Sequence, residues 1–282
     1  MLLTILKKSI WHYPKSVFAS YGFLWLVFEP ILGLGSKSSS YLSYSQFVVL
    51  SLFLGLIWFL IDGVYFSYFL IQSIEIKSNV FDTRIIITFG DLFKQKGWKA
   101  ISVNDHFDCL VDDCHISSKS LHGQMLQRYW GGNIEDWNCQ VDSQLSNNSS
   151  TVVSRDSGKL KSYSIGTTAT AIKDYEKFLC VAFSKTDIGS LQTKANTSDL
   201  NKAVRSLLCK ARSVCADEPL NIPLMGSGLS RVGIKNNILV NLILTAVFEE
   251  TKANKVTSQI RIILPKEKIS EFNLASIKND WN

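Results

Sequence analysis

The stretch that decides the fold runs from Asn221 to Ile234 and reads NIPLMGSGLSRVGI. A short apolar run, Leu220 to Met225, leads into its glycines, and apolar residues at helical spacing follow from Ile234 to Val247. The predicted order is therefore strand, glycine loop, helix. Glycines let backbone N–H groups approach an anion closely, and a helix N-terminus adds unsatisfied donors. The motif matches neither of the common phosphate-loop patterns, so a plain strand-to-helix turn remains the alternative.

Outward from this loop, the chain from about residue 78 alternates short strands and helices. Strands are predicted over 83–89, 99–103, 162–168, 177–184, 220–225 and 259–264, and helices over 120–129, 199–215 and from 234. Ser198 or Asp199 is expected to cap the second helix. Residues 130–161 are polar and without period, which predicts a loop excursion. The alternation predicts an α/β fold with a mixed sheet between two layers of helices, in which ligands bind at strand carboxyl ends.

Glycines and polar residues gather where these predicted strands end. The segment from Lys119 to Gly123 either presents Lys119 and His122 to an anion or is an ordinary helix start. Together the candidate ligand-binding residues are Asp91, Asn104, Asp105, His106, Phe107, Lys119, Ser120, His122, Gly166, Thr167, Thr168, Lys185, Gly226, Ser227, Gly228, Leu229, Ser230 and Arg231.

The N-terminal region, residues 1–77, differs in composition from the rest. Two apolar segments, about 17–34 and 47–71, are each long enough to cross about 30 Å of hydrocarbon as a helix. A buried core helix is the alternative for the first. Lysines and arginines are more frequent on the two outer flanks than in the short connection, which predicts a multi-pass protein with both termini in the cytoplasm. Residues 78–282 then form a cytosolic domain.

Two ionisable side chains fall inside or at the edge of these predicted spans, where a charge is costly unless it is paired or wetted. Glu29, beside Pro30, lies near the outer end of the first span and is expected at the interface. Asp62, beside Gly63, lies deeper and is the better candidate for a pore or a helix contact.

Composition and motifs exclude several classes of function. The net charge of +6 comes from scattered residues and no basic block is interleaved with aromatics, so nucleic acid is not an expected partner. The six cysteines are interpreted as reduced thiols of a cytosolic domain. His106, Cys109, Cys114 and His115 lack the paired C-x-x-C spacing of a zinc site, so no metal is predicted. Neither H-E-x-x-H nor G-x-S-x-G occurs.

The strand followed by Gly90-Asp91, the strand ending in Asn104, and Pro223 to Leu229 before a long helix resemble a macro domain, the family that binds ADP-ribose. This resemblance implies that Asp91 holds the adenine amino group and that Gly226 to Arg231 wrap the diphosphate. The triple-glycine loop of macro-domain hydrolases is missing after Asn104, which argues against hydrolysis. No catalytic residue and no cofactor are therefore predicted. Leu264 runs into Pro265-Lys266, so the usual aromatic that stacks on adenine is also absent.

Four further motifs, ISVNDHFD, SSKSLHG, YSIGTTA and NIPLMGSGLSR, occur in order behind two predicted spans. In this arrangement the chain is similar to the membrane-bound ThsA effectors of type II Thoeris antiphage systems. The resemblance implies a homo-oligomeric effector in the bacterial inner membrane that senses a histidine–ADP-ribose-like signal made by a TIR-domain partner enzyme and acts on the membrane. A membrane-tethered ADP-ribosyl hydrolase is the enzymatic alternative, and a scaffold that binds nucleotide only to stay folded is a third.

Overall fold

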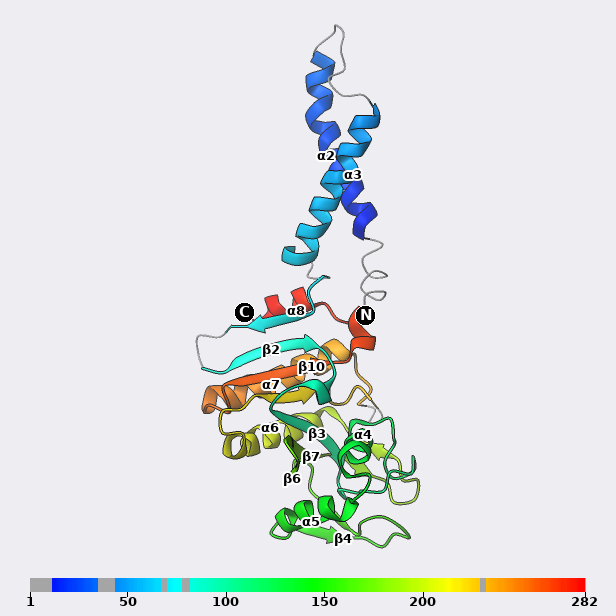
Figure 1. Cartoon of the computed structure of the whole chain (residues 1–282), viewed down its shortest axis with the longest axis vertical. Coiled ribbons are helices and arrows are strands. Elements are labelled where there is room, and N and C mark those ends of the chain that lie inside the picture. The colour runs from blue at the N-terminus through cyan, green and yellow to red at the C-terminus, as the bar shows by residue number, and fades with distance from the viewer. Residues whose placement is uncertain (1–11, 35–43, 67–69, 78–81, 229–231, 282) are drawn as a thin grey trace. The chain divides into compact units, whose positions relative to one another are not determined.

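The computed structural model describes residues 12–34, 44–66, 70–77, 82–228 and 232–281. Many of its helices and strands are labelled in Figure 1. The chain divides into two compact units. One comprises residues 1–74 with 266–281, and the other comprises residues 75–265.

In the first unit, helices α2 (His12–Leu34) and α3 (Tyr44–Ile61) form an antiparallel pair. Tyr13 meets Phe59 edge-on at a centroid distance of 5.7 Å, and Tyr21 meets Phe47 at 5.2 Å. A Cβ atom at Gly55 would lie 2.8 Å from the Cα of Val17, so glycine allows the close approach of the two backbones. The unit also holds η4 (Lys266–Glu271) and α8 (Leu274–Trp281).

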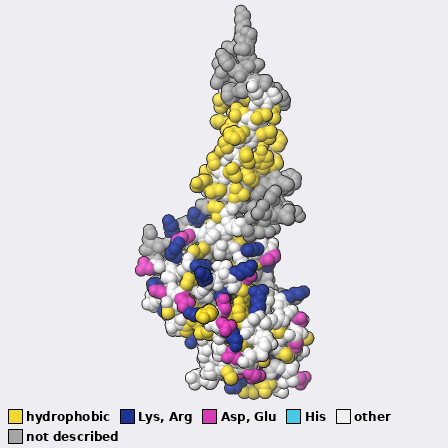
Figure 2. All heavy atoms as spheres, viewed as in Figure 1, with side chains coloured by type: hydrophobic (Ala, Val, Ile, Leu, Met, Phe, Trp, Pro, Cys, Tyr) yellow, Lys and Arg dark blue, Asp and Glu magenta, His cyan; other side chains and the backbone are white. Residues whose placement is uncertain are grey.

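The outward faces of this helix pair are apolar. Phe18, Leu26, Val49 and Phe53 are all more than half exposed, and hydrophobic side chains cover the described part of the pair in Figure 2. Of the residues searched, one helix, Ser45–Phe66, is long and apolar enough to cross a membrane by length and composition. It corresponds to the second predicted span. The first predicted span lies in α2, whose side chains from residue 28 onward, including Glu29, are outside the described residues, and it stays a prediction.

Asp62 lies where α3 changes its geometry. The helix continues as a π-helical segment, η1 (Asp62–Phe66), in which Gly63 is buried. Such segments are rare and are frequent at functional positions. The role predicted for Asp62 stays a prediction.

The second unit is built on a mixed sheet whose strands lie in the order β1-β2-β10-β9-β3-β7-β6, with β8 paired to β7. Its strands are β1 (Ser73–Ile76), β2 (Arg84–Phe89), β3 (Trp98–Asn104), β6 (Thr168–Lys173), β7 (Glu176–Thr186), β8 (Thr193–Lys194), β9 (Leu220–Pro223) and β10 (Gln259–Leu264). From β2 to β7 all neighbours are parallel, and β6 and β8 are antiparallel to β7.

Helices cover both faces of this sheet (Figure 1). On one face, α6 (Thr197–Val214) packs against α7 (Asn236–Ala253) and β7. On the other, the inward residues of β3, β6 and β7 form a core with α4 (Leu121–Met125), the π-helical η3 (Leu126–Trp130) and α5 (Ile134–Leu145). Trp130, Trp137 and Phe178 are fully buried in this core. The predicted α/β fold with a mixed sheet is confirmed.

Three local predictions are wrong. Residues 130–161 contain α5, because Trp137, Val141 and Leu145 form an apolar stripe among polar residues. They also contain β4 (Ser150–Val152), which pairs with β5 (Lys161–Tyr163) in a two-stranded antiparallel sheet. The strand expected over 162–168 is interrupted by a turn, since Gly166 has a φ of 92°. Asn196 caps α6, and Asp199 completes a capping box from the N3 position.

Candidate functional site

Parallel pairing brings the predicted loops to one edge of the sheet. The N–H of Gly90, after β2, donates to the carbonyl of Leu264 at the end of β10. The N–H of Asp105, after β3, donates to the carbonyl of Ser184 in β7. Strand β9 and its glycine loop lie between these two pairs. The segments after β2, β9 and β3 therefore leave the sheet at the carboxyl edge, where open α/β sheets bind ligands.

Gly226 and Gly228, in the loop after β9, are explained by different features of the structure. Gly226 has a φ of 84°, and a Cβ there would lie 2.8 Å from a methyl group of Val232, so the turn itself requires glycine. A Cβ at Gly228 would meet no heavy atom of the described residues within 4 Å, and Gly228 is exposed. Within the described residues, Gly228 therefore borders space that a ligand can enter. Ser227 donates its hydroxyl proton to the carbonyl of Leu224 at 2.9 Å, which closes the turn.

The rest of this loop is only partly described. Leu229, Ser230 and Arg231 lie outside the described residues, so their predicted ligand contacts stay predictions. Helix α7 begins at Asn236, two residues later than the sequence pattern indicates, and its N-cap Lys235 makes no side-chain capping hydrogen bond. The order strand, glycine turn, long helix is confirmed.

Asp91 follows β2 and is half-buried. Its Oδ1 accepts a hydrogen bond of 3.0 Å from the N–H of Phe93, which makes Asp91 the N-cap of the short helix η2 (Leu92–Lys94). The predicted contact to an adenine amino group would use the second oxygen of the same carboxylate. A cap and a base contact can therefore coexist at this residue.

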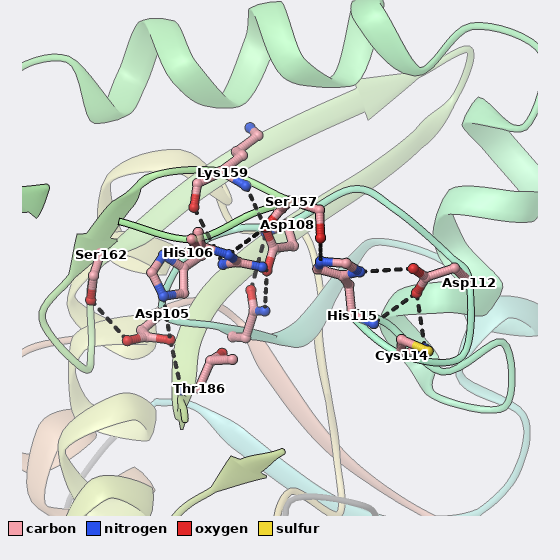
Figure 3. A network of polar contacts seen from close by, with 12 residues as sticks. Asp105, His106, Asp108, Asp112, Cys114, His115, Ser157, Lys159, Ser162 and Thr186 are labelled. Carbon is pink, nitrogen blue, oxygen red and sulfur yellow. Dashed lines mark hydrogen bonds and ion pairs between the residues drawn. The ribbon is translucent and has the colours of Figure 1, made fainter. Parts of the chain in front are cut away.

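Asn104 and the residues after it are held by other parts of the protein, and Figure 3 shows Asp105, His106 and Asp108 in this network. The Asn104 amide donates to Asp108 Oδ2 at 2.8 Å, and its oxygen accepts from the Asp108 N–H at 3.1 Å. Asp105 accepts from the Ser162 hydroxyl and from the N–H of Thr186. Both side chains are thus held by protein groups.

His106 and Phe107 are almost without exposed surface. The His106 Nδ1 donates to the carbonyl of Lys161 at 3.0 Å, and the Phe107 ring meets Tyr163 edge-on at 5.8 Å. The sequence places these residues among the ligand contacts, but in this structure they fix the loop to β5. A ligand would reach their side chains only if the loop opened.

A buried ion pair that the sequence analysis does not identify anchors the same loop. The Arg155 guanidinium lies 3.0 Å from Asp108 Oδ2, and the two side chains are 2% and 0% exposed. Asp108 also accepts from the Lys159 N–H at 2.8 Å. Gly158 permits this arrangement, because a Cβ there would lie 2.2 Å from the guanidinium. Arg155 is 47 positions from Asp108, and no local pattern links them.

The segment from Lys119 to Gly123 is an ordinary helix start. Ser120 is the N-cap of α4 and accepts from the Gly123 N–H at 2.9 Å, while Lys119 is exposed. The His122 ring is buried beside Trp137, and its Nε2 has no hydrogen-bond partner among the described residues. Burial lowers the pKa of His122 to about 3, so the imidazole is neutral at physiological pH. The prediction that His122 meets an anion is wrong for this conformation.

The remaining predicted contacts lie at the β6–β7 side of the sheet. A Cβ at Gly166 would lie 2.6 Å from the Ser206 hydroxyl of α6, so helix packing explains this glycine. Thr167 and Thr168 are half-buried at the start of β6, and Lys185 is exposed near the end of β7. Within the described parts of the chain, no three His, Cys, Asp or Glu side chains are placed to hold a metal ion.

The fold defines the class of protein. Solved structures with this fold include a mutant of the Oceanobacillus iheyensis macrodomain, with a TM-score of 0.51 and 11% identity over 75% of this chain and 97% of that one. Another is the same macrodomain with ADP, with a TM-score of 0.50 and 12% identity over 74% and 97%. The second unit thus has the fold of a macro domain.

The family is narrower than the fold. Residues 85–265 match the family model described as the macro domain of Thoeris protein ThsA, so the chain belongs to this family. It is also 25% identical over 263 residues to Thoeris protein ThsA of Bacillus amyloliquefaciens strain Y2, which covers 88% of this chain and 86% of that protein. The resemblance inferred from the sequence motifs is therefore confirmed.

Proposed function

We propose that this chain is an effector of a Thoeris antiphage system whose macro domain is the receptor for an ADP-ribose-type nucleotide. The observation that carries the proposal is the match of residues 85–265 to the ThsA macro domain. The carboxyl edge of the sheet supports it, because a Cβ at Gly228 in the loop after β9 would meet no described residue within 4 Å. A fold neighbour was solved with ADP, which has the adenine and the diphosphate expected here.

In the proposed complex, Asp91 accepts a hydrogen bond from the adenine amine and the loop from Gly226 to Arg231 holds the diphosphate. Backbone N–H groups bind such anions where glycine lets the backbone approach closely. The proposed signal is a histidine–ADP-ribose-like conjugate made by a TIR-domain partner enzyme.

A receptor fits the described loops better than a hydrolase does. Hydrolysis needs a general acid or base within reach of the substrate. The candidate groups Asp105, His106 and His122 are buried, and the first two are engaged by other parts of the protein. Calorimetry with ADP-ribose, followed by mass spectrometry of the recovered nucleotide, tests this choice. Intact ligand supports the receptor, whereas turnover supports the hydrolase.

The proposed output is disruption of the bacterial inner membrane, with both termini in the cytoplasm. Helix α3 is long and apolar enough to span, and the outer face of the α2–α3 pair is apolar. Two helices cannot enclose a pore, so several pairs must assemble, with Asp62 turned toward water. A ligand shifts such an assembly only through its different affinities for the two states.

Mass photometry of the full-length protein in detergent, with and without the nucleotide, tests the assembly step. Dye release from liposomes tests the membrane step. If nucleotide binds while the oligomeric state is unchanged and the liposomes stay sealed, the helices serve only as an anchor.

A further inference from the structure

A line of hydrogen bonds joins the side chains of Asp112, His115 and Ser157 within the polar network of Figure 3. Asp112 Oδ2 lies 2.8 Å from His115 Nδ1, and His115 Nε2 lies 2.9 Å from Ser157 Oγ. A carboxylate only accepts, so the imidazole carries its proton on Nδ1. Nε2 is then left to accept the proton of the Ser157 hydroxyl. This order of carboxylate, imidazole and hydroxyl is the one that activates a serine nucleophile.

The carboxylate is fixed in place and stays charged. Asp112 Oδ1 accepts backbone hydrogen bonds from Cys114 at 2.9 Å and from His115 at 2.7 Å. Burial raises the pKa of Asp112, but the hydrogen bonds from the His115 side chain and from the two backbone N–H groups outweigh it and bring the pKa to about 2. Asp112 therefore holds the imidazole orientation at neutral pH, while His115 itself is 4% exposed in its side chain.

Ser157 lies on a loop whose backbone carbonyls accept hydrogen bonds from Arg155. The buried guanidinium of Arg155 donates from Nε to the Ser157 carbonyl at 2.6 Å and from Nη1 to the Lys159 carbonyl at 3.3 Å. Gly158, with a φ of 84°, gives the loop its tight turn directly after the serine. Ser157 itself is exposed. Ser157 thus lies at the surface while its base is sheltered.

We propose that Ser157, His115 and Asp112 form a nucleophilic serine site that hydrolyses carboxylic esters. Ser157 is the nucleophile, His115 is the general base and Asp112 is a positioning residue. Nothing in this proposal depends on nucleotide binding at the sheet edge.

The reaction proceeds in two balanced steps. The Ser157 oxygen attacks the ester carbonyl as its proton passes to His115 Nε2, and that proton then leaves with the departing alcohol, which gives an acyl-serine. Water, deprotonated by His115, attacks the acyl-serine next. The carboxylic acid is released and the proton returns to Ser157. No oxidant, reductant or metal is needed.

The test uses full-length protein in detergent with two probes, a fluorophosphonate and p-nitrophenyl acetate. Fluorophosphonate is expected to modify Ser157, located by peptide mass spectrometry. Ser157→Ala is expected to lower ester hydrolysis about 100-fold or more, as losing nucleophilic catalysis with its general base does. Ser154→Ala, in the same segment, is the matched control and keeps the wild-type rate. Asp112→Asn is expected to lower kcat with KM unchanged, because it disturbs the imidazole and not the binding of the ester.

Absence of fluorophosphonate on Ser157, or a wild-type rate for Ser157→Ala, overturns the proposal and leaves the three side chains as a tether between two loops. A change in KM with kcat unchanged for Asp112→Asn also counts against it. Calorimetry of Ser157→Ala with ADP-ribose separates the two sites, since this variant should bind the nucleotide with wild-type affinity.

Discussion

Replacing Gly228 by valine should abolish most nucleotide binding without disturbing the fold. A Cβ at this position meets no heavy atom of the described residues within 4 Å, so this part of the free protein has room for the new side chain. An exposed substitution of this kind changes the free energy of unfolding by about 0.5 kcal/mol or less. The effect should therefore appear in binding and not in stability.

The magnitude follows from the geometry of hydrogen bonds to phosphate. The backbone nitrogen must come within about 3.2 Å of the phosphate oxygen. A valine methyl group in the space beside this N–H keeps the oxygen about 3.5–4.0 Å from the methyl carbon, so the oxygen must move outward. The oxygen is then held beyond hydrogen-bonding range. Losing one hydrogen bond to a charged group costs about 1.5–3 kcal/mol, which weakens the affinity about 10- to 150-fold.

The assay is calorimetric titration of ADP-ribose into wild type and variant, with thermal unfolding of each. Gly132→Val is the matched control, because a Cβ at Gly132 also meets nothing within 4 Å and Gly132 lies between η3 and α5. An affinity of Gly228→Val within about twofold of wild type, or an equal loss in Gly132→Val, would refute the phosphate role of this loop.

Three further outcomes are expected. Asp91→Ala should lose both affinity and the preference for adenine over guanine. Asp91→Ser keeps a side-chain cap for η2 but has no carboxylate, so the same titrations separate capping from base recognition. His122 is buried and its pKa is lowered to about 3. As the pH falls below about 6.5, His122 therefore takes up a proton in the unfolded state but not in the folded state. The free energy of unfolding then falls by about 1.4 kcal/mol per pH unit toward pH 3. His122→Phe should flatten this part of the stability profile in urea unfolding, and a slope equal to that of wild type would show that other groups cause it. Arg155→Met leaves the buried Asp108 carboxylate unpaired and should cost about 3–5 kcal/mol of unfolding free energy, and a loss below about 1 kcal/mol would mean that water replaces the guanidinium.

The sequence by itself determined the elements that carry a strong local pattern. The β-branched runs of β2 and β10 and the apolar stripe of α6 were predicted to within about two residues, because strand and helix periods depend on near neighbours. The glycine turn after β9 and the apolar run of α3 were identified for the same reason. Ordered motifs along the chain were sufficient to indicate the family.

Elements with weak local patterns were decided by packing. Helix α5 lies in a stretch that is polar in composition, and it is stabilised because Trp137 and Val141 enter the core beneath β6 and β7. The turn at Gly166 divides a run that reads as one strand, since α6 passes close above it.

Only the tertiary structure decided which polar side chains are buried and held by other parts of the protein. Asp105 and His106 follow a strand end, as ligand contacts do, yet their partners Ser162 and Lys161 lie more than fifty positions away. The pairing of Arg155 with Asp108, on which the position of Ser157 depends, spans a similar distance. Burial and hydrogen bonding between such distant segments exist only once the chain is folded, so a linear pattern can show that a residue is polar but not which way it points.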